Sequence, residues 1–476
     1  MNRLRTTLLT LLLTAGLVLP GHAVQAQATM DGADARTPDN ADRIVVVDGD
    51  EEDDAEDDAD ASAEDSDEAA LYKEPSPGVE TNGYSVTAAQ QEEPSLNVNV
   101  TGSLRFNALF RAYGVDTQFE NYADRALGNG GFTFDTFRIG ANGTYGDFKF
   151  DFEYAFYPSS FGGNYLHHGW VGYEFSDARQ IQVGVSQVPF GIQPYASSSW
   201  FFNYSYYVGL EDDYDAGIKA MYQANGWDIQ GAFYMNAEQT TFFGTANAAR
   251  YSYDVVPTTN ADYIDTRGVS EQNQFNIKIA RTFDHGDLGF TKVGVSGQRG
   301  QLISQGDGDF QTNVTGNGET DWHAAYAVHL QGRYEGFDAK LQFAQQEMNP
   351  PNVNDDRFVI MGAYGSPNRV ASEVDVYSSS LAYHIPVDLG PISEFKPYYD
   401  FSQVTKSVDG WNDNTMHDIG VLTSAGPMFV YTDLIISKGH PFNQPFDGSF
   451  NGVMAENADA DNDWRTAFNI NIGIYF

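Results

Sequence analysis

From residue 96 onward, apolar and polar side chains alternate with a period of two. Over residues 96–111, leucine, valine, phenylalanine and alanine occupy one set of positions, and asparagine, serine, threonine and arginine occupy the other. Side chains of a strand point alternately to its two faces, whereas a helix repeats every 3.6 residues, so the pattern predicts a β-strand. The alternation returns at 148–156, 227–235, 337–343 and 464–476. The sequence is therefore typical of an all-β fold.

The connections between these strands alternate in length. Seven short turns fall near residues 145–147, 176–178, 224–226, 284–287, 335–336, 387–391 and 425–426. Eight longer polar connections separate them, at about 113–131, 158–164, 189–214, 237–271, 300–321, 348–373, 405–414 and 439–462. Together they join sixteen strands, and the short/long asymmetry is typical of outer-membrane barrels.

A ring of sixteen strands encloses a lumen too wide for side chains to fill, which argues against a soluble barrel with an apolar interior. In a bilayer, a closed barrel satisfies every backbone amide and has no free edge. The sequence therefore predicts an all-β, 16-stranded antiparallel transmembrane β-barrel over residues 96–476. The aromatic face would contact outer-membrane lipid and lipopolysaccharide, and the polar face would line water. The bacterial outer membrane is the predicted location.

The segment before the barrel has a different composition. Residues 1–26 predict a signal peptide, with Arg3 and Arg5 before an apolar run that is too short to span a bilayer. Residues 27–95 include the almost wholly acidic run from Asp48 to Asp60. Such dense like charge cannot offset the entropy of ordering, so this part predicts a disordered acidic periplasmic leader.

Composition excludes several classes of function. The net charge of −40 argues against a nucleic-acid partner, because phosphate backbones require basic patches. The chain has no cysteine, which excludes disulfides and thiolate sites. The serines and histidines permit many pairings but specify no nucleophile–base set. We expect neither enzyme activity nor a cofactor.

Residues 183–191, with the sequence VGVSQVPFG, resemble the GQ-x-x-x-PFG segment of the phosphate-selective porin O/P family. Residues 137–140 and 148–155 are similar to that family's R-x-R-x-G and K-F-E-Y hairpin, and residues 213–218 are similar to the strand after its third loop. The resemblance implies a homotrimer of 16-stranded barrels, in which the third loop folds inward and narrows the pore. It also implies phosphate as a solute, yet residues 188–213 contain no lysine or arginine. Binding an anion at a constriction requires such charges or amide donors.

The predicted constriction loop, at about 189–213, is rich in aromatic and acidic residues. Its rings suit either stacking on a sugar or packing against the wall, and we slightly favour packing. The candidate constriction residues are Phe190, Tyr195, Trp200, Phe201, Phe202, Tyr204, Tyr206, Tyr207, Glu211, Asp212 and Asp213.

Alternation also predicts which charged residues face the lumen. The basic set is Arg105, Arg111, Arg138, Lys149, Lys219, Lys278, Arg333, Lys340 and Lys396. The acidic set is Asp151, Glu153, Asp228, Asp338 and Asp400. The cations would either form a track for anions or pair with the carboxylates. We favour pairing, since acidic residues outnumber basic ones.

No metal site is predicted. His167 and His168 are adjacent, so on a regular strand they would face opposite sides and could not bind one ion together. Asp459, Asp461 and Asp463 have the spacing of calcium ligands but lack the glycine of a calcium loop, which favours a solvated loop.

The last strand alternates up to Phe476, and this ending resembles the signal that the barrel-assembly machinery recognises. The sequence thus favours a porin for passive diffusion of small hydrophilic solutes or ions. The alternatives are a solute-specific channel for anions such as phosphate or for sugars, and a non-conducting surface protein that binds a partner.

Overall fold

The computed structural model describes residues 94–112, 130–159, 161–238, 240–241, 244–245, 251–257, 268–304, 319–351, 353, 355–364, 366–443 and 462–476. The predicted signal peptide and nearly all of the predicted acidic leader lie outside these ranges, so both stay predictions. Asp459 and Asp461 also lie outside them.

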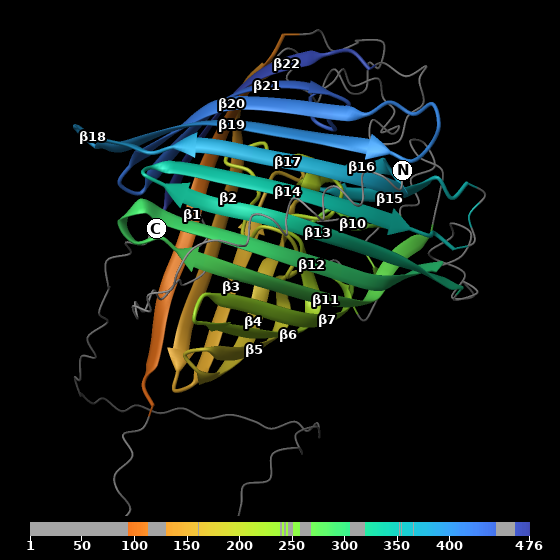
Figure 1. Cartoon of the computed structure of the whole chain (residues 1–476), viewed down its shortest axis with the longest axis horizontal. Helices are drawn as coiled ribbons and strands as arrows, with labels where there is room; N and C mark the ends of the chain where they lie inside the picture. Colours follow the sequence, from red (N-terminus) through yellow and green to blue (C-terminus); the bar gives the residue numbers. More distant parts are fainter. Residues whose placement is uncertain are drawn as a thin grey trace, which may run out of the picture. The chain divides into compact units, whose positions relative to one another are not determined.

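The described residues form long antiparallel strands (Figure 1). The first seven are β1 (Leu96–Arg111), β2 (Gly130–Tyr145), β3 (Phe148–Phe156), β4 (Asn164–Ser176), β5 (Arg179–Gln187), β6 (Tyr214–Ala224) and β7 (Trp227–Ala237). The next four are β11 (Val269–Asp284), β12 (Gly289–Ser304), β13 (Thr320–Tyr334) and β14 (Phe337–Met348). The last are β17 (Glu373–Tyr383), β18 (Ile385–Leu389), β19 (Ile392–Lys406), β20 (Asn414–Ala425), β21 (Met428–Lys438) and β22 (Arg465–Tyr475).

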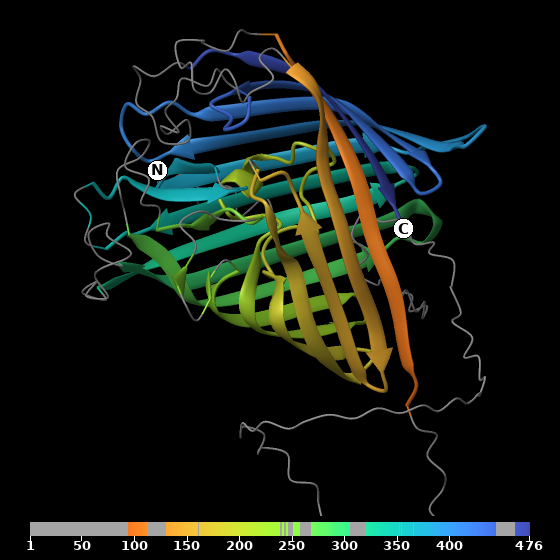
Figure 2. The same cartoon turned by 180° about the vertical axis from the view of Figure 1, so that it is seen from behind.

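These strands close into one ring of sixteen positions. Each strand pairs with the next in sequence, β7 pairs with β11, and β14 pairs with β17. β17 and β18 both pair with β19, so they occupy one position. The ring closes where β1 pairs with β22, which lie side by side in Figure 2. The predicted 16-stranded antiparallel barrel is confirmed, as are its seven short turns and eight longer connections.

Smaller elements belong to the longer connections. β8 (Thr240–Thr241) pairs with β9 (Gly244–Thr245), and β10 (Asp254–Val255) joins a three-stranded sheet with β15 (Phe358–Ala363) and β16 (Ser366–Ala371). Within the described ranges, the helical elements are α3 (Tyr204–Tyr207) in the β5–β6 connection and the 3-10 turn η1 (Gly286–Leu288), which lies instead in the short β11–β12 turn. Among the described residues, no helix has the length and apolar character needed to cross a membrane.

The two faces of the barrel differ as the alternation predicts. Val100, Ile139, Val183, Ile277 and Leu341 are examples of large apolar side chains that lie exposed on the outer face. The polar side chains between them are buried in the barrel, where they meet the loops described below. Because apolar residues on the outside are unfavourable in water, this outer face is suited to contact lipid.

The last residue of the chain completes the closure. The N–H of Phe476 donates to the carbonyl of Gly102 (3.0 Å), and the N–H of Gly102 donates to the carbonyl of Phe476 (2.7 Å). The Phe476 ring lies over Gly102, where an added Cβ would come within 2.6 Å of it. The residue predicted as an assembly signal therefore continues the pairing of β22 with β1.

Candidate functional site

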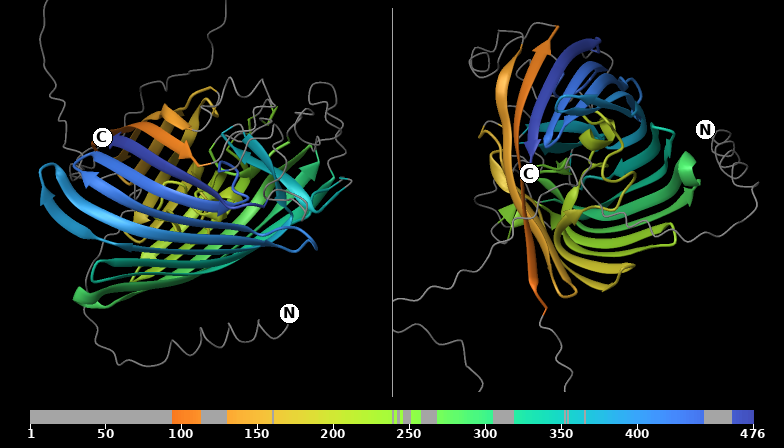
Figure 3. Two further views of the ribbon diagram at one scale, coloured as in Figure 1. Left: turned by 90° about the horizontal axis from the view of Figure 1, so that it is seen from above. Right: turned by 90° about the vertical axis from the view of Figure 1, so that its left-hand side faces the viewer.

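The connection from β5 to β6, residues 188–213, folds into the barrel, and we call it the third loop. In the right-hand view of Figure 3, the yellow-green coil that contains α3 lies within the ring of strands. Its backbone bonds to inner-face side chains of β12, β14 and β19, and β19 lies nearly opposite β5 and β6 in the ring. The third loop thus crosses the interior instead of standing above the strands.

One end of the third loop is held by Gly191 and Ile192. The N–H of Gly191 donates to Ser296 Oγ (2.8 Å) on β12, and the N–H of Ile192 donates to Gln342 Oε1 (2.8 Å) on β14. Gly191 has φ +56°, and an added Cβ would lie 2.3 Å from Gln342 Oε1. Only glycine fits this approach without displacing the acceptor of the next amide.

We expect Gly191→Ala to weaken docking of the third loop by about 2–3 kcal/mol, the sum of a strained positive φ and a lost buried hydrogen bond. Limited proteolysis of the folded barrel in detergent would show faster cleavage within residues 188–213. Gly410→Ala is the matched control, because Gly410 also has positive φ (+81°) but nothing lies within 4 Å of its added Cβ. Equal cleavage of the two variants would contradict the packing argument.

The middle of the third loop is held by two oppositely charged residues. Asp400 Oδ2 on β19 accepts from the N–H groups of Ser198 (2.8 Å) and Ser199 (2.7 Å). Lys340 Nζ on β14 donates to the carbonyls of Tyr195 and Ser197, each at 2.8 Å. Both charged side chains therefore form hydrogen bonds with backbone groups that would otherwise be buried without partners.

The aromatic side chains of the third loop are mostly buried. Phe202 stacks on Tyr206 with ring centroids 4.3 Å apart, and Tyr207 contacts His440 at 4.5 Å. Burial is nearly complete for Phe190, Tyr195, Phe202, Tyr204, Tyr206 and Tyr207, whereas Trp200 and Phe201 are half-buried. The six buried rings present no open face to a sugar, which favours the packing interpretation for them, whereas Trp200 and Phe201 keep part of their surface open.

Two other connections pack onto the third loop. Tyr253 and Val255, from the β7–β11 connection, join one apolar cluster with Phe358 and Ile360 of β15 and with the third-loop aromatics. The Tyr206 hydroxyl donates to the carbonyl of Tyr251 (2.7 Å). Three connections that are far apart in sequence therefore form one core inside the ring.

The acidic end of the third loop is also buried. Glu211 Oε1 accepts from the N–H of Ala196 (3.0 Å), and burial raises the pKa of Glu211 to about 8, although nearby Lys340 acts in the opposite direction. Asp212 accepts from the Tyr251 hydroxyl (2.5 Å) and from Gln187 Nε2 (3.2 Å). The carboxyls of Glu211 and Asp212 therefore accept hydrogen bonds from protein groups.

Most predicted lumen cations have protein partners. Five form ion pairs: Arg105 with Asp135 (3.1 Å), Arg138 with Glu153 (2.8 Å), Lys149 with Glu174 (2.9 Å), Lys278 with Asp228 (3.9 Å) and Arg333 with Asp338 (2.5 Å). Lys219 donates to the carbonyl of Gln187 (3.0 Å) and Lys340 to the third loop. Arg111 and Lys396 are half-buried. This arrangement favours pairing over a free basic track.

The sequence did not single out several partners. Lys292 binds Asp228 at 2.8 Å, closer than the predicted Lys278. Asp135 pairs with Arg105, and the Tyr157 hydroxyl accepts from both Arg105 and Arg138 at 2.9 Å. Lys292 follows the inward alternation of β12, so a stricter count of faces would have included it. Asp135 lies at the register shift between β1 and β2, out of step with the inward Thr136 and Arg138, so alternation alone could not have found it.

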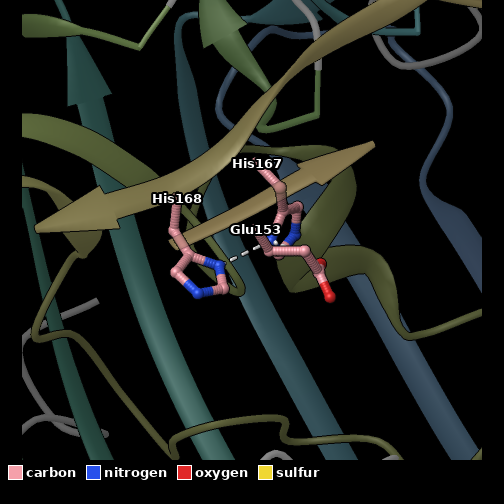
Figure 4. Close-up of side chains that lie close together, drawn as sticks. All are labelled: Glu153, His167 and His168. Carbon is pink, nitrogen blue, oxygen red and sulfur yellow. Dashed lines mark hydrogen bonds and ion pairs between the residues drawn. The ribbon is translucent and has the colours of Figure 1, made fainter. Parts of the chain in front are cut away.

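The prediction that His167 and His168 face opposite sides is wrong. The β3–β4 register shifts between Glu153 and Tyr154, so this bulge places both imidazoles beside Glu153 (Figure 4). Their Nδ1 atoms are 2.9 Å apart, and His167 Nδ1 lies 3.2 Å from Glu153 Oε1. A bulge adds one residue to a strand and breaks the period of two.

The three side chains in Figure 4 have the donors of a transition-metal site, with ligand atoms within 4.8 Å of one another. The same Glu153 oxygen, however, accepts from Arg138 Nη1 at 2.8 Å. His168 Nε2 lies 3.3 Å from Asp151 Oδ1. The carboxylate is thus neutralised by a guanidinium, and we assign the group to an ion-pair network of the wall.

No protein-family model and no curated protein sequence matches the chain. Among solved structures, it resembles the outer membrane channel DcaP of Acinetobacter baumannii, with a TM-score of 0.51, 11% identity, and 80% of this chain and 97% of that chain covered. An anion-selective porin from Comamonas acidovorans has a TM-score of 0.46 and 14% identity over 80% and 100% of the two chains. OmpF of Salmonella typhi, in complex with daunomycin, has a TM-score of 0.46 and 12% identity, with 80% of this chain and 97% of that chain covered.

At such low identity, the likeness to DcaP supports the fold alone. The closed ring and its apolar outer face independently require a membrane. The chain therefore has the 16-stranded β-barrel fold of outer-membrane porins and resides in the bacterial outer membrane.

Proposed function

We propose that the barrel is an outer-membrane channel through which small hydrophilic solutes and ions diffuse passively. The observation that carries this proposal is the third loop, which is docked inside a ring with a polar inner face. Lysine and aspartate side chains hold its backbone to the opposite wall. A loop in this place reduces the cross-section through which a solute must pass, so it would set the size limit.

We further propose that the channel does not prefer phosphate. The third loop has no lysine or arginine, and most of the described lumen cations are paired with carboxylates or carbonyls. An anion would have to compete with those partners. The resemblance to the phosphate-selective porin O/P family thus extends in our proposal to the inward third loop, and not to its solute.

Single-channel recording in a planar bilayer tests both proposals. We expect stable conductance from the folded protein, cation preference in a KCl gradient, and no block by added phosphate. Phosphate block with anion preference would overturn the selectivity, and block by a sugar would favour the alternative of a sugar-specific channel. Folded protein without conductance would overturn the channel and favour the surface-binding alternative.

The proposal includes the assembly in which such barrels occur. We propose a homotrimer that contacts lipopolysaccharide and is inserted by the barrel-assembly machinery through the pairing end at Phe476. Light scattering of the detergent-solubilised protein would give the number of copies, and a monomeric mass would overturn this part.

The conductance and the cation preference of the channel should depend on pH through Glu211. Its folded pKa of about 8 lies above its usual value, so the stability from the neutral carboxyl is complete below about pH 4.5 and is lost as pH rises through 8. Between about pH 4.5 and 8, docking of the third loop should weaken by about 1.4 kcal/mol per pH unit, and above pH 8 it should stay at the lower value because Glu211 is then ionised in both states.

We expect conductance and cation preference to change between pH 7 and 9, as measured in symmetric KCl at each pH. Glu211→Gln, which keeps the acceptor without the charge, should remove the step. A step of the same size and midpoint in this variant would assign the titration to another group.

A further inference from the structure

The mouth of the barrel beside the third loop contains a buried group of carboxylates. Asp213 ends the third loop, Asp215 is in β6, and Asp254 is in β10 of the β7–β11 connection. One carboxylate oxygen from each lies within 4.8 Å of the others. Their side chains belong to residues that are only 8%, 3% and 2% exposed. Three carboxylates so close together cannot all be ionised without a counter-charge.

Two further carboxylates border the group. Glu238 Oε1 accepts from the N–H of Ser252 (3.1 Å), and Glu271 Oε1 accepts from the N–H of Val255 (2.8 Å). These bonds hold residues 252–255 against the wall, which fixes Asp254 opposite Asp215. The glutamates thus build the backbone of the site and add to its negative potential.

The described part of the chain supplies no lysine or arginine as an ion-pair partner for Asp213 or Asp215. Asp213 Oδ1 and Asp215 Oδ1 also have no hydrogen-bond donor among the described residues. Burial and neighbouring carboxylates raise the pKa values of Asp213 and Asp254 well above their usual range. The group therefore either holds protons or binds a cation.

The buried amide of Gln274, next to the group, favours a cation. Gln274, 3% exposed, donates through Nε2 to Asp215 Oδ2 (3.2 Å), while its Oε1 has no partner among the described residues. A 180° flip of this amide would place Oε1, in place of Nε2, beside the Asp215 carboxylate. His323 is fully buried near Glu271, with Nε2 3.9 Å from Glu271 Oε2, and neither ring nitrogen has a hydrogen-bond partner in the described structure.

We propose that Asp213, Asp215 and Asp254 bind a calcium ion, with the Gln274 amide oxygen as a further ligand. The donors are all oxygen, which excludes preference for soft metals, and several carboxylates in an irregular arrangement suit Ca²⁺ better than the strict octahedron of Mg²⁺. Its ligands would come from the third loop, the wall and the β7–β11 connection. The ion would therefore link the third loop and the β7–β11 connection to the barrel wall.

Terbium luminescence tests the site in the full-length, folded protein in detergent after removal of metals with EDTA. Tb³⁺ replaces Ca²⁺ at oxygen sites and emits when a nearby tyrosine is excited, and Tyr251 and Tyr253 lie in the same short segment as Asp254. We expect saturable emission that CaCl₂ displaces at concentrations at least tenfold lower than MgCl₂. Equal displacement by both salts would overturn the assignment to calcium.

The variants Asp215→Asn and Asp254→Asn separate binding from folding. Each keeps the shape and removes one charge, so each should lower the affinity at least tenfold and, in EDTA, leave the barrel as heat-stable as the wild type or more so. Asp388→Asn, an exposed aspartate on β18, is the matched control and also reports binding by acidic residues elsewhere. Wild-type binding no tighter than that of Asp215→Asn would overturn the site. Because the readout is not conductance, it is independent of the proposed channel.

Discussion

Replacing Asp400 by alanine should release the third loop and raise single-channel conductance. The substitution leaves the N–H groups of Ser198 and Ser199 buried without their acceptor. At about 1–3 kcal/mol for each unsatisfied group, docking should weaken by about 2–6 kcal/mol. This loss is enough to shift a marginal loop toward an undocked state. Asp400→Asn, which keeps one acceptor oxygen, should give an intermediate conductance.

Planar-bilayer recordings of the three proteins would be compared with those of Asp388→Ala, which removes an exposed carboxylate from the neighbouring strand. Uptake of neutral sugars of increasing size into liposomes would show whether the size limit rises with conductance. Unchanged conductance, together with a loop that proteolysis shows to be released, would contradict the idea that the third loop is the constriction.

Deleting Phe476 should lower the amount of folded barrel in the outer membrane several-fold. The deletion removes both hydrogen bonds with Gly102 and leaves backbone groups at the β1–β22 seam without partners. In hydrocarbon each such group costs several kcal/mol, so an incompletely closed ring is strongly disfavoured. Heat-modifiable mobility of the membrane fraction on a gel measures the folded amount.

Phe476→Ala distinguishes two explanations of this loss. It keeps the backbone bonds and removes only the ring that covers Gly102. We expect a smaller loss than for the deletion if closure dominates. An equal loss would show that the ring itself is what the assembly machinery recognises.

The sequence was sufficient to predict the barrel because a membrane leaves few choices. Each strand must alternate, and each amide must pair with a neighbour, so period and turn length together define the ring. The exposed Val100 and Leu341 and the buried Asp228 and Lys278 lie on the faces that this rule assigns. Such local periodicity does not depend on knowing which strands meet.

The site could be predicted only in part, because its contacts join distant segments. Nothing near Ser199 indicates that Asp400 will accept its N–H, and nothing near Asp215 indicates Asp254. The bulge beside Glu153 moved His167 and His168 to one face, although the strict period separates them. Burial of the third-loop tyrosines depends equally on Tyr253 and Phe358, which come from other connections.

The bonds of the third loop also have a mechanical consequence for the ring. A wide barrel with only water inside resists flattening through its strand-to-strand hydrogen bonds alone. Here a segment that leaves one wall at Gln187 is fixed to the opposite wall at Lys340 and Asp400. The third loop therefore connects two walls across the interior of the barrel. Lateral pressure from the bilayer that would make the barrel oval must also stretch or shear the hydrogen bonds of Lys340 and Asp400.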